Sequence, residues 1–225
     1  MTGVFLQVRL SSKRLPEKAL IKIKDLTIIE HSMRALKQID VDHFILLTTE
    51  DCIARLESLA IRWGFTLFSG PEKDVLKRFI LASKKFKIDT IIRATGDNPL
   101  VSGEMASKVL KEHIHLGADY SNWTDAPYGS GIEVVESKAL IKADLNTNES
   151  YDREHVTPWV YNNPDSFMLN IKRTANKYLY NIKVSVDTED DLIRVQTIFD
   201  NIYNNQPIEL EDLINFCKQE NKTEK

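Results

Sequence analysis

Residues 4–18 read VFLQVRLSSKRLPEK and combine the two features that decide the fold. The first five residues are largely apolar and include two valines, which predicts a short buried strand. The residues that follow are polar and basic, and Pro16 among them is typical of a shaped turn at a strand end. A buried strand that leads directly into a polar loop indicates an α/β sheet, in which loops at the strand ends carry the ligand sites.

The same alternation of short apolar runs and amphipathic stretches continues along the chain. It predicts further strands at residues 43–48, 65–68, 90–92, 118–121, 132–135, 167–171 and 183–186. It predicts helices at residues 27–39, 51–63, 74–86, 102–117 and 187–203, the first of them opened by a capping box of Thr27 and Glu30. The pattern indicates a three-layer α/β fold with a mixed, mostly parallel sheet, in which the order becomes mixed after residue 120.

Length and composition restrict the class of protein. The 225 residues fit a single domain over residues 1–225, whose last eight or so residues we expect to be frayed. A net charge of −3 excludes the overall attraction that a nucleic-acid coat or a basic membrane binder would use, so we expect neither partner. Only Cys52 and Cys217 are present, and the sequence shows no apolar signal core or spanning segment, which predicts a cytoplasmic protein.

The loop after the first strand is strongly basic. Between residues 9 and 24 one acid, Glu17, stands against six basic residues, namely Arg9, Lys13, Arg14, Lys18, Lys22 and Lys24. This local net charge of +5 predicts an anion site, because arginine grips phosphate oxygens with a planar fork and lysine supplies a mobile point charge. A polyphosphate suits these groups, and a solvated basic loop is the alternative.

Two acidic residues follow other predicted strands. Asp97 lies in the segment Thr95-Gly96-Asp97-Asn98-Pro99, and Asp187 follows residues 184–186. Because the carboxyl ends of neighbouring strands form the ligand crevice of an open sheet, we expect both to converge with Arg9. Two carboxylates would repel a nearby triphosphate, but a Mg²⁺ ion between them binds oxygens of both and makes the arrangement favourable. Asp97 and Asp187 are therefore the predicted metal ligands. The alternative makes Asp97 a turn residue and Asp187 a helix cap.

Three further signals are weaker. Residues 122–131 contain Pro127 and two glycines and predict either a substrate loop or a solvent turn. His113 and His115 would point to different faces of a helix and do not predict a zinc site. His155 lies in a polar helical segment, where a substrate role and a structural hydrogen bond are both open.

A larger set of motifs carries a family resemblance. In chain order these are Gln7-Val8-Arg9, Ser12, Arg14-Leu15-Pro16, Lys18, Asp74-Val75-Leu76, Arg78, Thr95-Gly96-Asp97-Asn98-Pro99-Leu100, Glu133, Arg153-Glu154-His155-Val156-Thr157-Pro158 and Val186-Asp187-Thr188. The set resembles the spore coat polysaccharide biosynthesis protein F family, which is similar to the cytidylyltransferases that activate Kdo and sialic acids. It spans residues 3–200 of this sequence.

The resemblance implies a Rossmann-like glycosyltransferase A-type nucleotidyltransferase fold and a magnesium-dependent cytidylyltransferase. Such an enzyme transfers CMP from CTP to an acidic sugar or related acid, releases pyrophosphate, and serves surface polysaccharide or glycan biosynthesis. Carried onto matching positions, the catalytic residues are Arg9, Lys18 and Asp97. The nucleotide-binding residues are Arg9, Ser12, Arg14, Lys18, Asp74, Arg78 and Thr95, the acceptor-binding residues are Glu133, Arg153 and His155, and the metal ligands are Asp97 and Asp187.

The resemblance also implies a homodimer, for which residues 123–128 or 151–171 offer an apolar interface. Two positions depart from the family pattern: Ser11 stands where glycine is common, and Gly131 stands where many relatives have an acidic residue. Two other functions stay open. A glycosyltransferase that consumes a nucleotide sugar would release a nucleoside phosphate, and a non-catalytic nucleotide-binding subunit would bind CTP without turnover.

Overall fold

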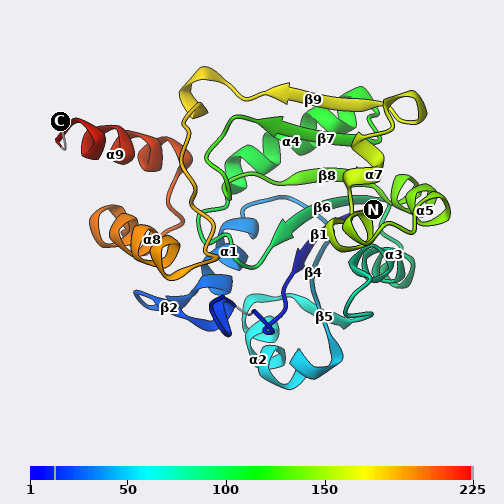
Figure 1. The fold of residues 1–225 in the computed structure, drawn as a ribbon, viewed down its shortest axis with the longest axis horizontal. Coiled ribbons are helices and arrows are strands. Elements are labelled where there is room, and N and C mark those ends of the chain that lie inside the picture. The colour runs from blue at the N-terminus through cyan, green and yellow to red at the C-terminus, as the bar shows by residue number, and fades with distance from the viewer. Residues whose placement is uncertain (13, 224–225) are drawn as a thin grey trace.

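A computed structural model describes residues 1–12 and 14–223, so Lys13 of the basic loop and residues 224–225 lie outside the described residues (Figure 1). Its main feature is one seven-stranded sheet with the order β5-β4-β1-β6-β8-β7-β9. The strands are β1 (Thr2–Gln7), β4 (His43–Thr48), β5 (Thr66–Ser69), β6 (Thr90–Thr95), β7 (Tyr120–Thr124), β8 (Glu133–Glu136) and β9 (Leu169–Arg173). A small antiparallel pair, β2 (Lys22–Ile23) and β3 (Leu26–Thr27), lies outside this sheet.

The sheet is mixed, as the sequence predicts. β1 pairs in parallel with β4 on one side and with β6 on the other, which places Val4 between Phe44 and Ile92. β8 is antiparallel to both β6 and β7, and its register sets Glu133 opposite Arg93. The parallel part therefore brings the carboxyl ends of β1 and β6 to the same edge of the sheet, where ligands bind in open α/β folds.

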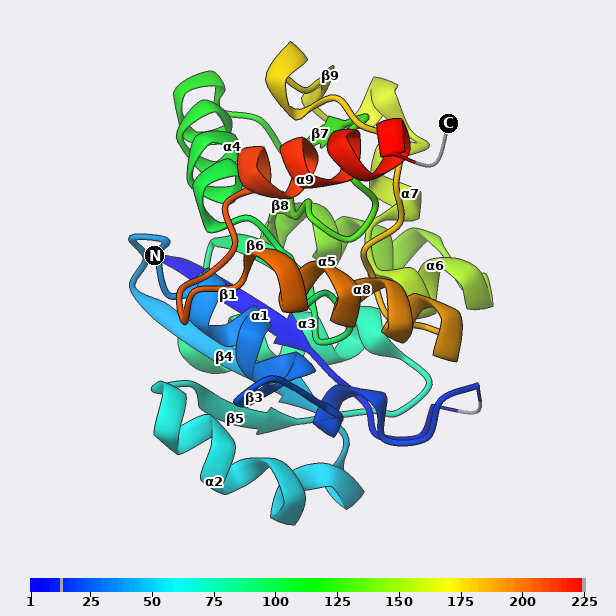
Figure 2. The same cartoon turned by 90° about the vertical axis from the view of Figure 1, so that its left-hand side faces the viewer.

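Helices cover both faces of the sheet and complete three layers (Figures 1 and 2). One face packs against α1 (Ile28–Leu36), α2 (Ile53–Trp63), α4 (Gly103–Leu116), α8 (Glu189–Ile202) and α9 (Leu210–Thr223). The other face packs against α3 (Val75–Phe86), α5 (Ser137–Asn146) and α7 (Pro158–Tyr161), and the short α6 (Ser150–His155) contacts α3. In Figure 2, α8 and α9 lie in front of the sheet and α3 lies behind it.

The alternation of side chains along β1 divides the core into two halves. Val4 and Leu6 belong to the first half, Phe5 belongs to the second, and all three are fully buried. This is the period-2 geometry of a strand with both faces covered, which explains why residues 4–8 are largely apolar rather than alternating with polar side chains. β1 is thus an inner strand with both faces covered, and the loop that leaves it starts from the buried core.

Most predicted elements are confirmed, including the capping box of Thr27 and Glu30 at the start of α1. The predicted strand at 183–186 is wrong. The backbone of this segment bonds to two different loops, since Val184 N donates to Tyr128 O and Val186 N donates to Asp97 O, and only an isolated bridge forms. A further helix, α9, is not among the predicted elements and continues to Thr223. The fraying expected of the last eight or so residues stays a prediction.

No helix in the described part of the chain is long and apolar enough to cross a membrane.

Candidate active site

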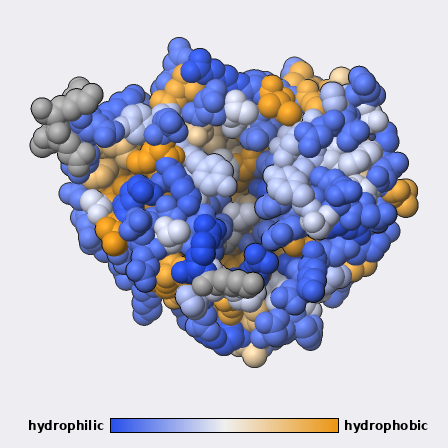
Figure 3. Space-filling model, in the orientation of Figure 1, coloured by the Kyte–Doolittle hydropathy of each residue, from blue (hydrophilic) through white to orange (hydrophobic). Residues whose placement is uncertain are grey.

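A cleft of about 1160 Å³ opens at the carboxyl ends of β1 and β6. Its walls come from these strand ends, the loop after β1, residues 122–131 and α6. The space-filling view shows this face hollowed near its centre, with mostly hydrophilic residues around the opening (Figure 3). The predicted site residues that line it are Arg9, Ser12, Arg14, Lys18, Arg78, Thr95, Asp97, Glu133, His155 and Asp187.

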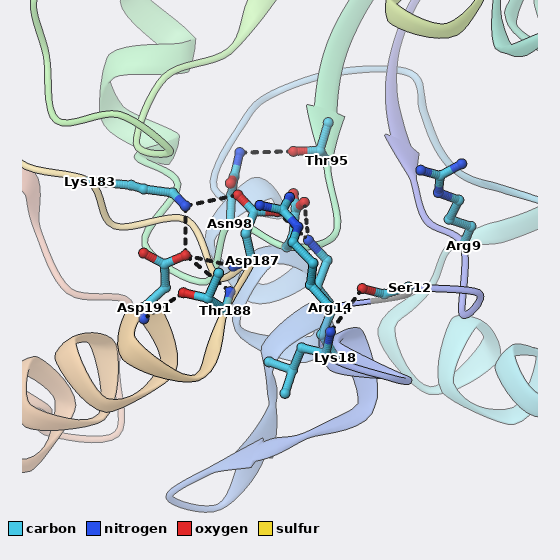
Figure 4. A network of polar contacts seen from close by, with 12 residues as sticks. Arg9, Ser12, Arg14, Lys18, Thr95, Asn98, Lys183, Asp187, Thr188 and Asp191 are labelled. Carbon is cyan, nitrogen blue, oxygen red and sulfur yellow. Dashed lines mark hydrogen bonds and ion pairs between the residues drawn. The ribbon is translucent and has the colours of Figure 1, made fainter.

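Lys18 lies at the meeting point of the two predicted metal ligands (Figure 4). It opens the short 3-10 helix η1 (Lys18–Leu20), and its Nζ atom donates to Asp97 Oδ2 at 2.7 Å and to Asp187 Oδ1 at 2.8 Å. The lysine side chain is only 14% exposed. Two carboxylates that are far apart in sequence thus share one cation, which is the convergence that the sequence analysis predicts for Asp97 and Asp187.

The turn after β6 fixes Asp97. Asn98 Nδ2 donates to Thr95 Oγ1 at 2.9 Å and closes the turn. A Cβ atom at Gly96 would lie only 3.1 Å from the Cβ of Val8, so glycine lets this turn pass close to the end of β1. The backbone of Asp97 also accepts from Val186 N at 2.9 Å, which ties the segment before α8 to the same turn.

The N-terminus of α8 fixes Asp187. The Asp191 carboxylate accepts from the backbone N–H groups of Asp187 and Thr188, both at 3.1 Å, as part of a capping box. Lys183 Nζ lies 3.0 Å from Asp187 Oδ2 and 2.6 Å from Asp191 Oδ2. Burial alone would raise the pKa of Asp187, but the hydrogen bonds from Lys18 and Lys183 outweigh burial and hold this pKa below its ordinary value.

Two residues of the basic loop lie beside this cluster. Arg14 Nη2 is 3.3 Å from Asp187 Oδ1, and its side chain is largely exposed to the cleft. The Ser12 hydroxyl oxygen accepts a long hydrogen bond of 3.4 Å from Leu15 N. The hydroxyl proton of Ser12 and the guanidinium of Arg14 are therefore available to an anion.

Arg9 lies apart from Lys18 and Asp187 in the same cleft (Figure 4). Its Nη2 atom is 3.4 Å from Glu154 Oε1 on α6, and both side chains are at least half exposed. An ion pair of this kind is weak because water and salt screen it. Arg9 is thus held loosely toward the α6 wall rather than toward the two aspartates.

Asp74 and Arg153 lie outside the described cleft lining. Asp74 caps α3 by accepting from Lys77 N at 2.9 Å. Arg153 Nη2 lies 2.5 Å from Asp74 Oδ2, and its Nη1 lies 2.7 Å from Asp144 Oδ1, so the guanidinium joins α6, α3 and α5. The predicted ligand roles of Asp74 and Arg153 stay predictions, and their contacts here are structural.

Arg78 reaches the cleft wall but is almost fully buried, with 3% of its surface exposed. Its guanidinium donates to the carbonyl oxygens of Pro71 and Glu72 and fixes the loop before α3. Because its guanidinium is bonded to this loop, Arg78 would act on a substrate by positioning the loop.

Glu133 is the centre of a polar cluster on the acceptor side of the predicted site. Its carboxylate pairs with Arg93 and accepts from Tyr120 Oη at 2.5 Å and from Thr157 Oγ1 at 2.9 Å. Burial and the neighbouring Glu133 carboxylate raise the pKa of Tyr120, which keeps the phenol protonated as a donor. Both oxygens of the Glu133 carboxylate already have donors from Arg93, Tyr120 and Thr157. The contacts of Glu133 here therefore position its neighbours.

An aromatic wall faces the same region. His155 lies with its ring 4.4 Å from that of Tyr151 on the same helix, α6. Trp123 from β7, Tyr128 from the loop that follows β7 and Tyr161 from α7 also line the cleft. Residues 122–124 of the predicted 122–131 loop therefore belong to a strand. Residues 122–131 thus contribute to the cleft, while a substrate contact by this loop stays a prediction.

Three other cleft residues have no individually predicted role. Gln7 Oε1, Arg93 Nε and Ser185 Oγ are buried atoms without a hydrogen-bond partner among the described residues, and all three residues line the cleft. A buried polar atom without a partner costs about 1–3 kcal/mol, which a bound ligand can recover. Two of these residues could have been found from the sequence, because Gln7 in β1 and Arg93 in β6 are polar residues at or near the end of an apolar strand.

The sequence is similar to those of known proteins. The sequence profile described as "Cytidylyltransferase" matches residues 4–223. The chain is 38% identical over 204 residues to the uncharacterized protein MJ1063 of Methanocaldococcus jannaschii, covering 87% of this chain and 83% of that protein. It is 31% identical over 202 residues to the spore coat polysaccharide biosynthesis protein SpsF of Bacillus subtilis, covering 86% of this chain and 84% of that protein.

A solved structure has a similar fold. A cytidylyltransferase from Leptospira borgpetersenii superposes with a TM-score of 0.90 at 25% sequence identity, and the match covers 98% of this chain and 95% of that one. This confirms the predicted nucleotidyltransferase fold of the Rossmann-like type.

Proposed function

Because the chain belongs to the cytidylyltransferase family, we propose that it transfers CMP from CTP to an acidic sugar or related acid, with Mg²⁺ as its metal. Pyrophosphate is the leaving group, and the product serves surface polysaccharide or glycan biosynthesis. The observation that carries the proposal is the convergence of Asp97 and Asp187 on Lys18 inside the cleft. It brings the predicted metal ligands and the predicted phosphate-binding loop to one place.

The donor set at this point fits Mg²⁺. Both carboxylates already bind one cation, the Lys18 ammonium, so their oxygens are oriented toward a shared position. No group of three or more potential metal-binding side chains occurs among the described residues. That suits Mg²⁺, which is commonly held by one or two carboxylates together with substrate phosphates. Held by Asp97 and Asp187, the ion supplies Lewis-acid polarisation of phosphoryl oxygens.

The basic side chains of the cleft neutralise the triphosphate. In the proposed reaction a hydroxyl oxygen of the acceptor bonds to the α-phosphorus of CTP and its proton passes to solvent. The bond from this phosphorus to the bridging oxygen of the β-phosphate breaks, and pyrophosphate leaves. Lys18 and Arg14 approach the phosphates from the loop after β1, and Arg9 approaches from the other side. These groups stabilise the charge that grows on the departing pyrophosphate. Such a reaction depends on positioning and charge neutralisation and needs no protein nucleophile.

The acceptor half of the cleft suits an acidic sugar. The Nε–H of Arg93 is a buried donor on a cationic side chain and has no partner among the described residues. A carboxylate is the strongest acceptor for such a donor. The aromatic faces of Trp123, Tyr128 and Tyr151 offer apolar surface to a sugar ring.

We also propose a homodimer. Both segments considered, 123–128 and 151–171, contribute residues to the cleft, and 151–171 also exposes Met168 and Ile171 outside the cleft lining. Light scattering in solution tests this proposal, and a monomer mass at all concentrations would contradict it.

The experiment for the reaction measures pyrophosphate release from CTP with a panel of acidic sugars and Mg²⁺. We expect release only when CTP, acceptor and metal are all present. Replacing Asp97 or Asp187 with Asn is expected to lower turnover by about 100-fold or more, with little change in the circular dichroism spectrum.

Each other outcome points to a different function. Release from another nucleotide but not from CTP would reject the cytidylyl assignment. A nucleoside mono- or diphosphate formed from a nucleotide sugar would indicate a glycosyltransferase. CTP binding without turnover across the panel would indicate a non-catalytic subunit.

A further inference from the structure

Lys18 occupies the position that a metal ion needs between the two aspartates. Its Nζ atom lies 2.7 Å from Asp97 Oδ2 and 2.8 Å from Asp187 Oδ1. Mg²⁺ binds its oxygen ligands at about 2.0–2.1 Å, so an ammonium and a metal ion cannot occupy this position together. A metal ion that takes Asp97 Oδ2 and Asp187 Oδ1 as ligands must therefore displace the ammonium of Lys18.

We infer that Lys18 competes with the metal ion and thereby couples metal binding to nucleotide binding. The inference rests on the proposed function, from which it takes the metal site and the triphosphate. Without nucleotide, the ammonium holds Asp97 and Asp187 together and keeps the metal ion out. The phosphate oxygens of CTP offer Lys18 other anionic partners, and the carboxylates then become available to the metal ion.

The surroundings of the two carboxylates make Lys18 the group that must move. Asp187 has two further cationic neighbours, Arg14 at 3.3 Å and Lys183 at 3.0 Å, so it stays partly neutralised when Lys18 leaves. For Asp97, Lys18 is the one ion-pair partner within the described part of the chain. Asp97 therefore loses its counter-charge when Lys18 moves, and a metal ion restores it.

The anchoring of Lys18 allows this movement. Its backbone begins η1 at the edge of the cleft, while its long flexible stem carries only the ammonium to the aspartates. The ammonium can therefore turn toward the phosphates without a change in the sheet. Lys183 is different, because it also pairs with Asp191 inside the capping box of α8.

Competition of this kind has a thermodynamic consequence. The free protein binds the metal ion weakly, and CTP strengthens metal binding. Linkage requires that the metal ion strengthen CTP binding by the same factor. Part of this coupling comes from direct attraction between the metal ion and the phosphates, and the part due to Lys18 disappears when the ammonium is removed.

The test is a Mn²⁺ titration followed by electron paramagnetic resonance, with and without CTP and without acceptor. In the absence of CTP, Lys18→Met is expected to bind Mn²⁺ roughly tenfold more tightly than the wild type, within the range of known couplings. The factor by which CTP strengthens Mn²⁺ binding is expected to fall in this variant. Lys183→Met is the matched control, since it removes a cation that contacts Asp187 but does not bridge to Asp97.

The outcomes separate this inference from the proposed function. If Lys18→Met binds Mn²⁺ no more tightly than the wild type, or if Lys183→Met gains as much, the competition is rejected. Asp97→Asn reports on the metal site itself. If it keeps full Mn²⁺ affinity with CTP present, the metal assignment of the proposed function fails, whichever result Lys18→Met gives.

A second measurement uses the wild-type protein alone, in case Lys18→Met does not fold. Acetylation of Lys18 by acetic anhydride, quantified by mass spectrometry against Lys183, reports whether the ammonium has left the aspartates. Mn²⁺ without nucleotide, at a concentration that fills the site, is expected to increase the labelling of Lys18. Unchanged labelling at that concentration would contradict displacement.

Discussion

Arg9 and Glu154 form an ion pair between the end of β1 and α6, with 3.4 Å between Arg9 Nη2 and Glu154 Oε1. The pair joins residues 145 positions apart and both side chains line the cleft. Since we propose that Arg9 neutralises the triphosphate, Glu154 competes with CTP for the same guanidinium. The pair directs the guanidinium of Arg9 toward α6 rather than toward the two aspartates.

Glu154→Gln tests this competition. The variant is expected to lower the KM for CTP by no more than about fivefold, because exposed ion pairs are worth at most about 1 kcal/mol. Steady-state kinetics at low and moderate salt measure the effect, which should shrink as salt screens the wild-type pair. Glu149→Gln, at the start of the same helix, is the control. A KM for CTP that rises in Glu154→Gln would show that Glu154 assists binding.

Arg93→Lys tests the acceptor side. The change keeps the positive charge but removes the unpartnered Nε–H and the planar fork that pairs with Glu133. We expect the KM for the acidic acceptor to rise about tenfold or more, since hydrogen bonds to charged groups are worth about 1.5–3 kcal/mol. The KM for CTP should change little. Equal increases in both constants would instead indicate that Arg93 supports the whole cleft.

Arg153→Met tests the structural contacts of the predicted acceptor residue. Arg153 bonds to Asp74 and Asp144 in a half-buried cluster, so its loss removes the ion-pair partner of Asp74 and leaves Asp144 paired with Lys77, at 2.8 Å. We expect the free energy of unfolding to fall by about 2 kcal/mol in urea titrations. Arg55→Met, which breaks an exposed pair with Glu17, should have little effect. An unchanged stability with a raised KM for the acceptor would support the predicted ligand role instead.

The lowered pKa of Asp187 predicts how stability depends on pH. An aspartate whose pKa is lower in the folded protein than its ordinary value of 3.8 stabilises the fold above pH 3.8. This stabilisation is lost as the pH falls through the folded pKa. Asp187→Asn should therefore be less stable than the wild type at pH 7, and the difference in unfolding free energy should shrink steadily in acid.

Asp190→Asn is the matched control for this pH series, because Asp190 is an exposed acid in the first turn of the same helix. Urea unfolding at pH 7 and in steps down to pH 3 gives both curves. If the difference for Asp187→Asn were constant over this range, the ionised carboxylate would not be the source of the stabilisation.

The sequence alone predicts the parts of this fold that local patterns determine. The apolar run of β1 and the spacing of Thr27 and Glu30 depend on neighbouring residues only, and both are confirmed. The segment 183–186 is apolar in alternate positions and resembles a strand, but its partners are the 128 loop and the Asp97 turn. Its hydrogen bonds depend on the path of distant loops, which periodicity does not contain.

In the site, too, features that follow from local sequence could be predicted, and contacts between distant segments could not. The place of Asp97 could be predicted, because the end of a strand such as β6 lies at the edge of the sheet where ligands bind. The convergence of Asp187 is predicted from a strand at 183–186 that does not form, and the hydrogen bond from Val186 N to Asp97 O brings Asp187 there instead. That Lys18 bridges the two aspartates could not be predicted, because a lysine in a basic loop can reach many positions. Arg153 and Asp74 pair with each other across two helices, and no sequence spacing reveals such a contact.

The most direct test of the account is a crystal structure with Mn²⁺ and a non-hydrolysable CTP analogue, in which anomalous scattering locates the metal. We predict one anomalous peak with carboxylate oxygens of Asp97 and Asp187 among its ligands, triphosphate oxygens completing the sphere, and Lys18 on the phosphates. A triphosphate bound away from these residues, or a metal ion that contacts neither aspartate, would contradict the account.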